Sequence, residues 1–193
     1  TAIKNYKKAL SLKKDFAVAL NNLGNAYIDF DKPKDSLQYF NKALESNPSY
    51  AEAYNGMGAA NEELGNKNDA LKNYQKATEI KPDYAEAYNS LGRLYSNLSK
   101  FDESLSNFKK AIQLKTNYEK AYNNLGNLLS NLGKFDEATN AYKQAIKIKP
   151  DYPKAYSNLL FNLIYKTDFD LNYYLSEAKK FRLNCKTIKK LKF

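Results

Sequence analysis

The sequence predicts an all-α fold, an α-solenoid built from stacked helix hairpins. Two observations lead to it: residues of the same type return every 34 positions, and apolar residues within each period follow helical spacing twice. A hairpin this short cannot bury its apolar face by itself, so neighbouring hairpins have to stack against one another. We therefore expect the 193 residues to form an array of repeats rather than one globular core.

The 34-residue period is visible in several columns of equivalent residues. Small residues occupy two of these columns and aromatic residues occupy another, and this many columns in one register exclude a chance alignment. The glycine column is Gly24, Gly58, Gly92 and Gly126, the alanine column is Ala43, Ala77, Ala111 and Ala145, and one aromatic column is Tyr54, Tyr88, Tyr122 and Tyr156.

Each period contains two helices separated by a short polar break. In the third period, the spacing of apolar residues predicts a first helix over 85–98 and a second helix over 101–114. Pro48 follows a predicted second helix and cannot continue it, whereas Pro33 falls near the start of a second helix, where a missing N–H costs little.

The start of the first helices carries a capping signal. Ser49 and Asp83 each stand three residues before a glutamate, which is the spacing of a capping box. In such a box the side-chain oxygen accepts a hydrogen bond from a helix N–H that has no other partner. We therefore expect both residues to cap the helices that follow them.

The glycine column requires a reason, because glycine inside a helix costs about 1 kcal/mol relative to alanine. Four of the first helices keep it nevertheless, at Gly24, Gly58, Gly92 and Gly126. We expect that another backbone approaches each of these positions closely, and that the alanine column serves the same close approach.

These columns identify a known repeat. The string beginning at Tyr88, Tyr-x-x-Leu-Gly-x-x-Tyr, followed by Phe108 and Ala111, closely resembles the tetratricopeptide repeat (TPR). The resemblance covers about residues 1–166, and Leu160 stands where the last unit would have glycine. It implies a second helix over 1–14, four full repeats over 17–152, the first helix of a divergent repeat over 153–166, and a capping helix with a basic junction over 167–193.

The TPR resemblance implies a right-handed α-solenoid that binds a protein or an extended peptide in a concave groove lined by first helices. Polar residues that the packing columns leave unexplained on these helices are the candidate peptide-binding residues. Because an asparagine amide both donates and accepts, a row of asparagines can hold a peptide backbone without reading its side chains. The alternative is that these asparagines are simply solvated, since the chain has 24 of them. The candidates are Asn21, Asn22, Asn25, Asn55, Asn89, Arg93, Asn123, Asn124, Asn127 and Asn158.

The net charge of +10 raises nucleic acid as a third, weaker hypothesis for the partner. Only two of the 31 basic residues are arginines, and half of the surplus lies from Lys166 onward, so the charge indicates solvated surfaces rather than a phosphate-binding one. Basic residues on the first helices, which some TPR domains use to clamp a C-terminal carboxylate, are limited to Arg93, Lys120 and Lys154. This scarcity argues against such a clamp.

The end of the chain departs from the repeat and predicts a further amphipathic helix over about 171–183, capped by Asp168 or Asp170. The preceding string, Asn158-Leu-Leu-Phe161-x-Leu-x-Tyr165-x-x-Asp168, resembles the junction in SPINDLY-type O-linked N-acetylglucosamine transferases, where TPR repeats lead into a glycosyltransferase domain. That resemblance implies an asparagine ladder formed by Asn22, Asn124 and Asn158, interrupted at Gly56 and Ser90.

Several functions are excluded on this chain. It has no histidine and one cysteine, Cys185, so neither a histidine-based catalytic triad nor a Cys/His zinc site can form, and no catalytic residue, metal or cofactor is predicted. A single cysteine also excludes an intrachain disulfide, which favours a reducing compartment, and we expect a cytoplasmic location. No apolar run suggests a membrane span.

Two main hypotheses follow. The first is a peptide-binding TPR segment that recruits partners to a longer O-GlcNAc-transferase-like enzyme, with the glycosyltransferase domain in cis. The alternative is a free-standing TPR adaptor with no attached enzyme. Since the chain lacks an initiator Met and begins within a helical pattern, we expect it to be part of a longer protein.

Overall fold

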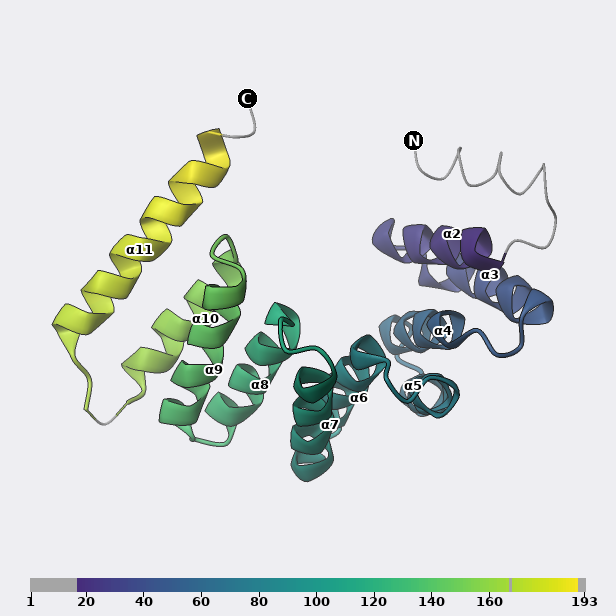
Figure 1. Cartoon of the computed structure of the whole chain (residues 1–193), viewed down its shortest axis with the longest axis horizontal. Coiled ribbons are helices and arrows are strands. Elements are labelled where there is room, and N and C mark those ends of the chain that lie inside the picture. The colour runs from purple at the N-terminus through teal and green to yellow at the C-terminus, as the bar shows by residue number, and fades with distance from the viewer. Residues whose placement is uncertain (1–16, 167, 191–193) are drawn as a thin grey trace. The chain divides into compact units, whose positions relative to one another are not determined.

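A computed structural model describes residues 17–166 and 168–190, and within these ranges the chain forms ten helices and no strand, which confirms the all-α prediction (Figure 1). The predicted partial repeat over 1–14 lies outside the described residues. The chain divides into two compact units, which we call unit 1 (Thr1–Leu94) and unit 2 (Tyr95–Phe193). The helices are α2 (Ala17–Asp29), α3 (Pro33–Ser46), α4 (Ala51–Glu63), α5 (Lys67–Ile80), α6 (Ala85–Asn97), α7 (Phe101–Leu114), α8 (Glu119–Asn131), α9 (Phe135–Ile148), α10 (Pro153–Ile164) and α11 (Leu171–Lys190).

In both units, consecutive helices form hairpins that stack side by side. In unit 1, α2 packs on α3 and α4 on α5, while α4 also contacts α2 and α3, around a core that includes Leu20, Phe40 and Ala53. In unit 2, α8 packs on α9, α10 lies against both of them, and α11 covers α10. The core of unit 2 includes Tyr142 and Leu159. Apolar faces too small to be stable alone are thus buried between neighbours.

The glycine column is explained by aromatic rings and not by a second backbone, so the close-approach prediction requires a correction. A Cβ atom placed on Gly58 would lie 2.5 Å from the ring of Tyr74, and one on Gly126 would lie 2.6 Å from the ring of Tyr142. Each ring comes from the second helix of the same hairpin. A buried ring needs more room than a methyl group leaves, which is why glycine stands opposite it.

The predicted cap at Ser49 is wrong. Helix α4 begins at Ala51, its N-cap residue is Tyr50, and no side chain makes a capping hydrogen bond there. Ser49 lies within the preceding turn, where its N–H donates to Asn47 Oδ1 at 3.1 Å. The turn therefore uses the Asn47 side chain, and the serine comes one residue too early to cap the helix. Pro33 is the first residue of α3, as predicted.

Helix α11 begins at Leu171, as predicted, but it continues to Lys190 instead of ending near 183. Asp170 caps it, because Asp170 Oδ1 accepts from the N–H of Asn172 at 2.8 Å and of Tyr173 at 3.1 Å. The middle of α11 is held on α10, where the Phe181 ring stacks on Tyr156 with centroids 5.7 Å apart and Asn184 Nδ2 donates to the Tyr156 hydroxyl at 2.6 Å. Asn184 lies just past the predicted end near 183, so this hydrogen bond supports the longer helix.

Replacing Asp170 with alanine should loosen α11 by about 1 kcal/mol, because two helix N–H groups lose their acceptor. Faster hydrogen exchange of amides in the first turns of α11, with little change elsewhere, would show this. Asp170→Asn retains a capping oxygen and serves as the matched control. Equal exchange rates in Asp170→Ala and the wild type would contradict the capping role.

Candidate functional site

The predicted residues of unit 1 lie on the first helices α2, α4 and α6, but they differ in exposure. Asn21 and Asn89 are buried, with 5% and 9% of their surface exposed. Asn22 and Asn55 are half-buried. Asn25 and Arg93 are exposed. The column that contains Asn21, Asn55 and Asn89 is therefore directed mainly toward neighbouring helices, and Asn22, Asn25 and Arg93 offer the polar groups that a partner can reach.

Arg93 is held by residues that sequence reasoning missed. Its guanidinium donates to Glu62 Oε2 at 2.9 Å and lies 3.5 Å from the Tyr74 hydroxyl, which itself donates to the same carboxylate oxygen at 3.0 Å. Burial, reinforced by the charge of Glu62, raises the pKa of the Tyr74 phenol, so the phenol remains a donor. The network fixes Arg93 across α4, α5 and α6.

Carboxylates gather beside this network at the ends of α2 and α4. Burial raises the pKa of Glu63, and the neighbouring charges of Asp31, Glu62 and Asp29 raise it further, against the lowering effect of Arg93. Charges act on a carboxyl group in this way only at short range, so these carboxylates lie close to Glu63 at the ends of α2 and α4.

In unit 2, three of the predicted asparagines form one hydrogen-bonded network. The Asn158 Nδ2 donates to Asn123 Oδ1 and to Asn127 Oδ1, each at 2.9 Å, and the Tyr142 hydroxyl donates to Asn127 Oδ1 at 2.9 Å. The residues come from α8, α9 and α10, so the network joins three helices. Burial raises the pKa of Tyr142 to about 12, which keeps its hydroxyl protonated as the donor.

The network separates two groups of asparagines. Asn123 has no exposed surface, so its amide supports the packing of α10 on α8 and offers nothing to a partner directly. Asn124, Asn127 and Asn158 are half-buried, so part of each residue remains exposed. The alternative that these asparagines are merely solvated does not hold for Asn123, Asn127 and Asn158, because their amides are engaged with one another.

Asn158→Ala should lower the free energy of unfolding of unit 2 by about 1–3 kcal/mol, because the fully buried Asn123 loses its donor. Chemical denaturation followed by circular dichroism would measure the loss. Asn140→Ala, at an exposed position of α9, is the matched control and should change stability by less than about 0.5 kcal/mol. The same small effect for both variants would argue against a structural network.

The sequence did not predict a role for one further asparagine, Asn162. Asn162 is fully buried on α10, and its Nδ2 donates to the carbonyl of Phe135 at 2.8 Å and to Thr139 Oγ1 at 2.9 Å. No equivalent asparagine occurs in the other repeats, so the 34-residue columns contained no signal for it. Asn162 therefore links α10 to α9, one helical turn after Asn158.

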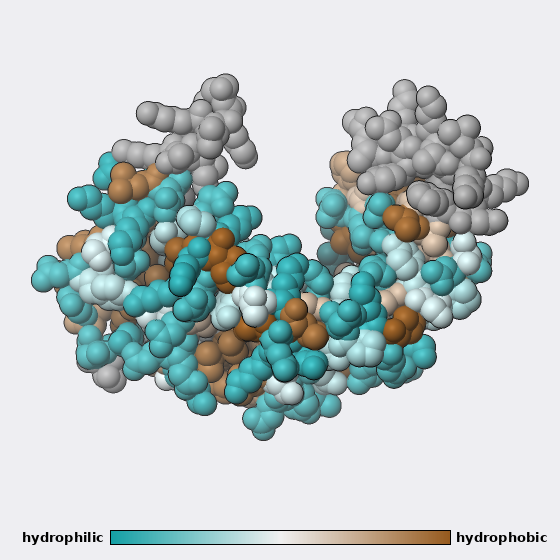
Figure 2. All heavy atoms as spheres, viewed as in Figure 1, coloured by the Kyte–Doolittle hydropathy of each residue, from teal (hydrophilic) through white to brown (hydrophobic). Residues whose placement is uncertain are grey.

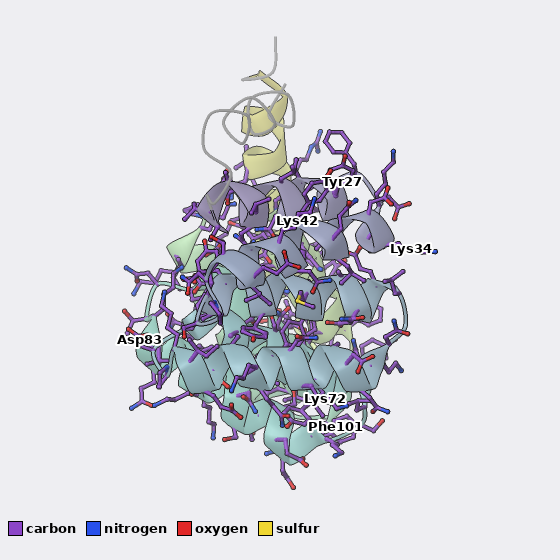
Figure 3. The ribbon with its side chains drawn as sticks, turned by 90° about the vertical axis from the view of Figure 1, so that its right-hand side faces the viewer. Tyr27, Lys34, Lys42, Lys72, Asp83 and Phe101 are labelled. Carbon is purple, nitrogen blue, oxygen red and sulfur yellow. The ribbon has the colours of Figure 1, made fainter. Side chains whose placement is uncertain are left out.

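Most lysines lie away from these faces. Lys34, Lys42 and Lys72 are exposed on the second helices α3 and α5 (Figure 3). In the view of Figure 2 the surface is predominantly hydrophilic, with hydrophobic atoms showing between polar side chains. Exposed lysines on second helices are typical of solvated helix surfaces.

Residues 17–166 and 168–190 contain no group of three or more Cys, Asp or Glu side chains placed to hold a metal ion. Within the same ranges, no helix is both long and apolar enough to cross a membrane.

Comparison with known proteins identifies the repeat family. Models described as tetratricopeptide repeat match residues 17–50, 39–72 and 119–152. A model described as TPR repeat matches residues 1–29, 63–99 and 92–133, which is more than half of the chain. No curated protein matches the sequence.

Solved structures show the same fold. One is a crystal structure of MamA, whose sequence is 30% identical to this chain. The match covers 77% of this chain and 86% of the MamA chain, with a TM-score of 0.62. YrrB, a TPR protein with an unusual peptide-binding site, is 24% identical in sequence. The match covers 96% of this chain and 97% of the YrrB chain, with a TM-score of 0.64. TTC0263, a thermophilic TPR protein of Thermus thermophilus, is 22% identical in sequence. The match covers 86% of this chain and 98% of the TTC0263 chain, with a TM-score of 0.70.

Proposed function

Because the chain belongs to the tetratricopeptide-repeat family, we propose that it is a protein-binding scaffold that holds extended peptide segments on its first helices. The observation that carries this proposal is the asparagine network of unit 2. Asn158 and Asn127 are held in place by buried partners, yet both remain half-exposed on neighbouring first helices. Polar groups fixed before binding lose little side-chain entropy when a ligand arrives.

Amide side chains suit a ligand that is recognised through its main chain. Each peptide group carries one donor and one acceptor, and an asparagine amide can satisfy both. Asn22 and Asn25 on α2 carry such amides in unit 1, and Asn124 carries one in unit 2. Asn158 Nδ2 and Asn127 Oδ1 are already engaged in the network, so Asn158 Oδ1 is left as the acceptor and Asn127 Nδ2 as the donor for a peptide group. We assign the buried Asn21, Asn89 and Asn123 to supporting these faces. YrrB, which shares the fold, has a peptide-binding site, and this agrees with the proposal.

The test is to pan a displayed peptide library against the chain and measure affinities of the selected peptides by fluorescence polarisation. Replacing Asn22, Asn25 and Asn124 with alanine should weaken binding at least about tenfold, which corresponds to about 1.4 kcal/mol, with the melting temperature nearly unchanged. The matched control replaces Asn41 and Asn140, which are exposed on second helices. No selected peptide at all, or equal affinity for both variants, would overturn the proposal.

A finer form of the proposal concerns what the scaffold serves. The resemblance of residues 158–168 to a TPR–glycosyltransferase junction supports a scaffold that recruits proteins to an O-GlcNAc-transferase-like domain in cis, with α11 as the connecting and capping helix. A free-standing adaptor is the alternative, and the similarity to MamA fits it equally. The coding sequence after Phe193 decides between them: an α/β glycosyltransferase domain supports the first, and an immediate stop codon excludes it.

A further inference from the structure

Unit 2 differs from unit 1 in the charges of one pair of equivalent repeat positions. In unit 1, the Lys81 ammonium donates to Glu52 Oε1 at 2.7 Å, and this hydrogen bond raises the pKa of Lys81. Two repeats later the same positions carry Lys120 and Lys149. Where unit 1 has an ion pair, unit 2 therefore has two cations.

The first helices of unit 2 continue this excess of positive charge. Lys120 and Lys154 are the second residues of α8 and α10, both are exposed, and neither belongs to an ion pair in the part of the chain that the structure describes. A helix N-terminus adds partial positive charge at the same place. Two acids lie in the same stretch, Glu119 at the start of α8 and Asp151 just before α10. The cations Lys120, Lys149 and Lys154 outnumber them, which favours an anionic group at this end of the face.

The other end of the same face is aromatic. Phe161, Ile164 and Tyr165 share one side of α10 by their spacing, and they are 60%, 54% and 53% exposed. The rings of Phe161 and Tyr165 are 5.0 Å apart between centroids, and Tyr165 also stacks on Phe135 of α9 at 6.1 Å. Exposed apolar side chains that form a contiguous patch mark an interaction site more often than scattered ones do.

The two ends are joined by the asparagine network. Asn158 stands between Lys154 and Phe161 at helical spacing, and its amide donates to Asn123 and Asn127 of helix α8. At 1.5 Å per residue, Lys154 is about 10 Å from Phe161 and about 16 Å from Tyr165 along α10. An extended peptide spans these distances with about three to five residues.

We propose that this face of unit 2 selects peptides that carry an acidic side chain and, three to five residues away, an aromatic or large aliphatic side chain. The acid lies by Lys120 and Lys154, the peptide backbone lies on Asn124, Asn127 and Asn158, and the apolar side chain lies on Phe161 and Tyr165. The inference rests on the proposed function and gives it a specificity. It requires no C-terminal carboxylate, so it differs from the clamp that the scarcity of basic residues argued against.

The experiment uses the complete 193-residue chain and a displayed library of random twelve-residue peptides. Selected peptides should be enriched in Asp or Glu at the stated spacing from Phe, Tyr or Leu. The charge reversal Lys120→Glu with Lys154→Glu should weaken these peptides at least about tenfold. Phe161→Ser with Tyr165→Ser should do the same. Lys147→Glu and Phe169→Ser, at exposed positions off this face, are the matched controls.

The outcomes separate the two proposals. If no peptide is selected, the peptide-binding function itself fails. If peptides are selected but lack the acid–apolar pair, or bind the charge-reversed and the wild-type chain equally, only the specificity fails. Circular dichroism and melting of each variant identify any loss caused by unfolding. In that case the conservative pair Lys120→Gln and Lys154→Gln replaces the charge reversal, and unchanged binding by it would equally overturn the inference.

Discussion

Replacing Phe40 with alanine should lower the free energy of unfolding of unit 1 by about 3–5 kcal/mol. Phe40 has no exposed surface, and its ring lies against the backbone of Gly24 on α2 and of Gly56 on α4. The side chain therefore fills the space between two hairpins, and its removal leaves a cavity that two packed helices cannot close without moving. Urea denaturation followed by circular dichroism would measure the change.

Phe30→Ala is the matched control, because the same side chain is 63% exposed there and its removal should cost less than about 0.5 kcal/mol. If Phe40→Ala cost no more than the control, the ring would not be the element that joins the first two hairpins. Partial unfolding is also expected to spread from α2 and α3, because each hairpin of a repeat array depends on its neighbour.

Gly126→Leu should destabilise unit 2 by about 1–3 kcal/mol. A Cβ atom at this position already lies 2.6 Å from the Tyr142 ring, so a longer side chain has to displace either the ring or α9. The helix propensity gained by replacing glycine, about 1 kcal/mol, opposes this loss without cancelling it. Thermal melting of the variant would show a lower midpoint.

The cause can be isolated with a double-mutant cycle. Tyr142→Ala removes the ring, so the losses from Gly126→Leu and Tyr142→Ala should not add when the two are combined. Asn131→Leu, at an exposed end of α8, is the control for introducing leucine. Strict additivity would show that the ring is not what leucine meets.

The repeat columns predicted most of the helices and their order. The period predicted helices over 85–98 and 101–114, and the structure has them at Ala85–Asn97 and Phe101–Leu114. Local signals were less reliable: Ser49 had the spacing of a cap, but the turn used Asn47 instead. Several acceptors compete within a turn, and spacing alone does not rank them.

The candidate site was predictable in its residues but not in their roles. Asn123 and Asn124 are adjacent and chemically identical, yet Asn123 is completely buried and Asn124 is half-exposed. Adjacent residues of a helix point about 100° apart, and only the position of α10 decides which of them it covers. Glu62 was missed for a related reason, since its partners Tyr74 and Arg93 come from two other helices.

The sequence by itself determined that this protein is an array of TPR helix hairpins, because a 34-residue period and helical spacing are properties of the chain's own order. It also determined that the glycine column marks close packing. Only the tertiary structure decided that aromatic rings occupy those positions, that Asn158 joins Asn123 and Asn127, and that Phe161 and Tyr165 form one patch. Each of these depends on which side chain a neighbouring helix brings within a few ångströms, and packing distances are not encoded in any single repeat.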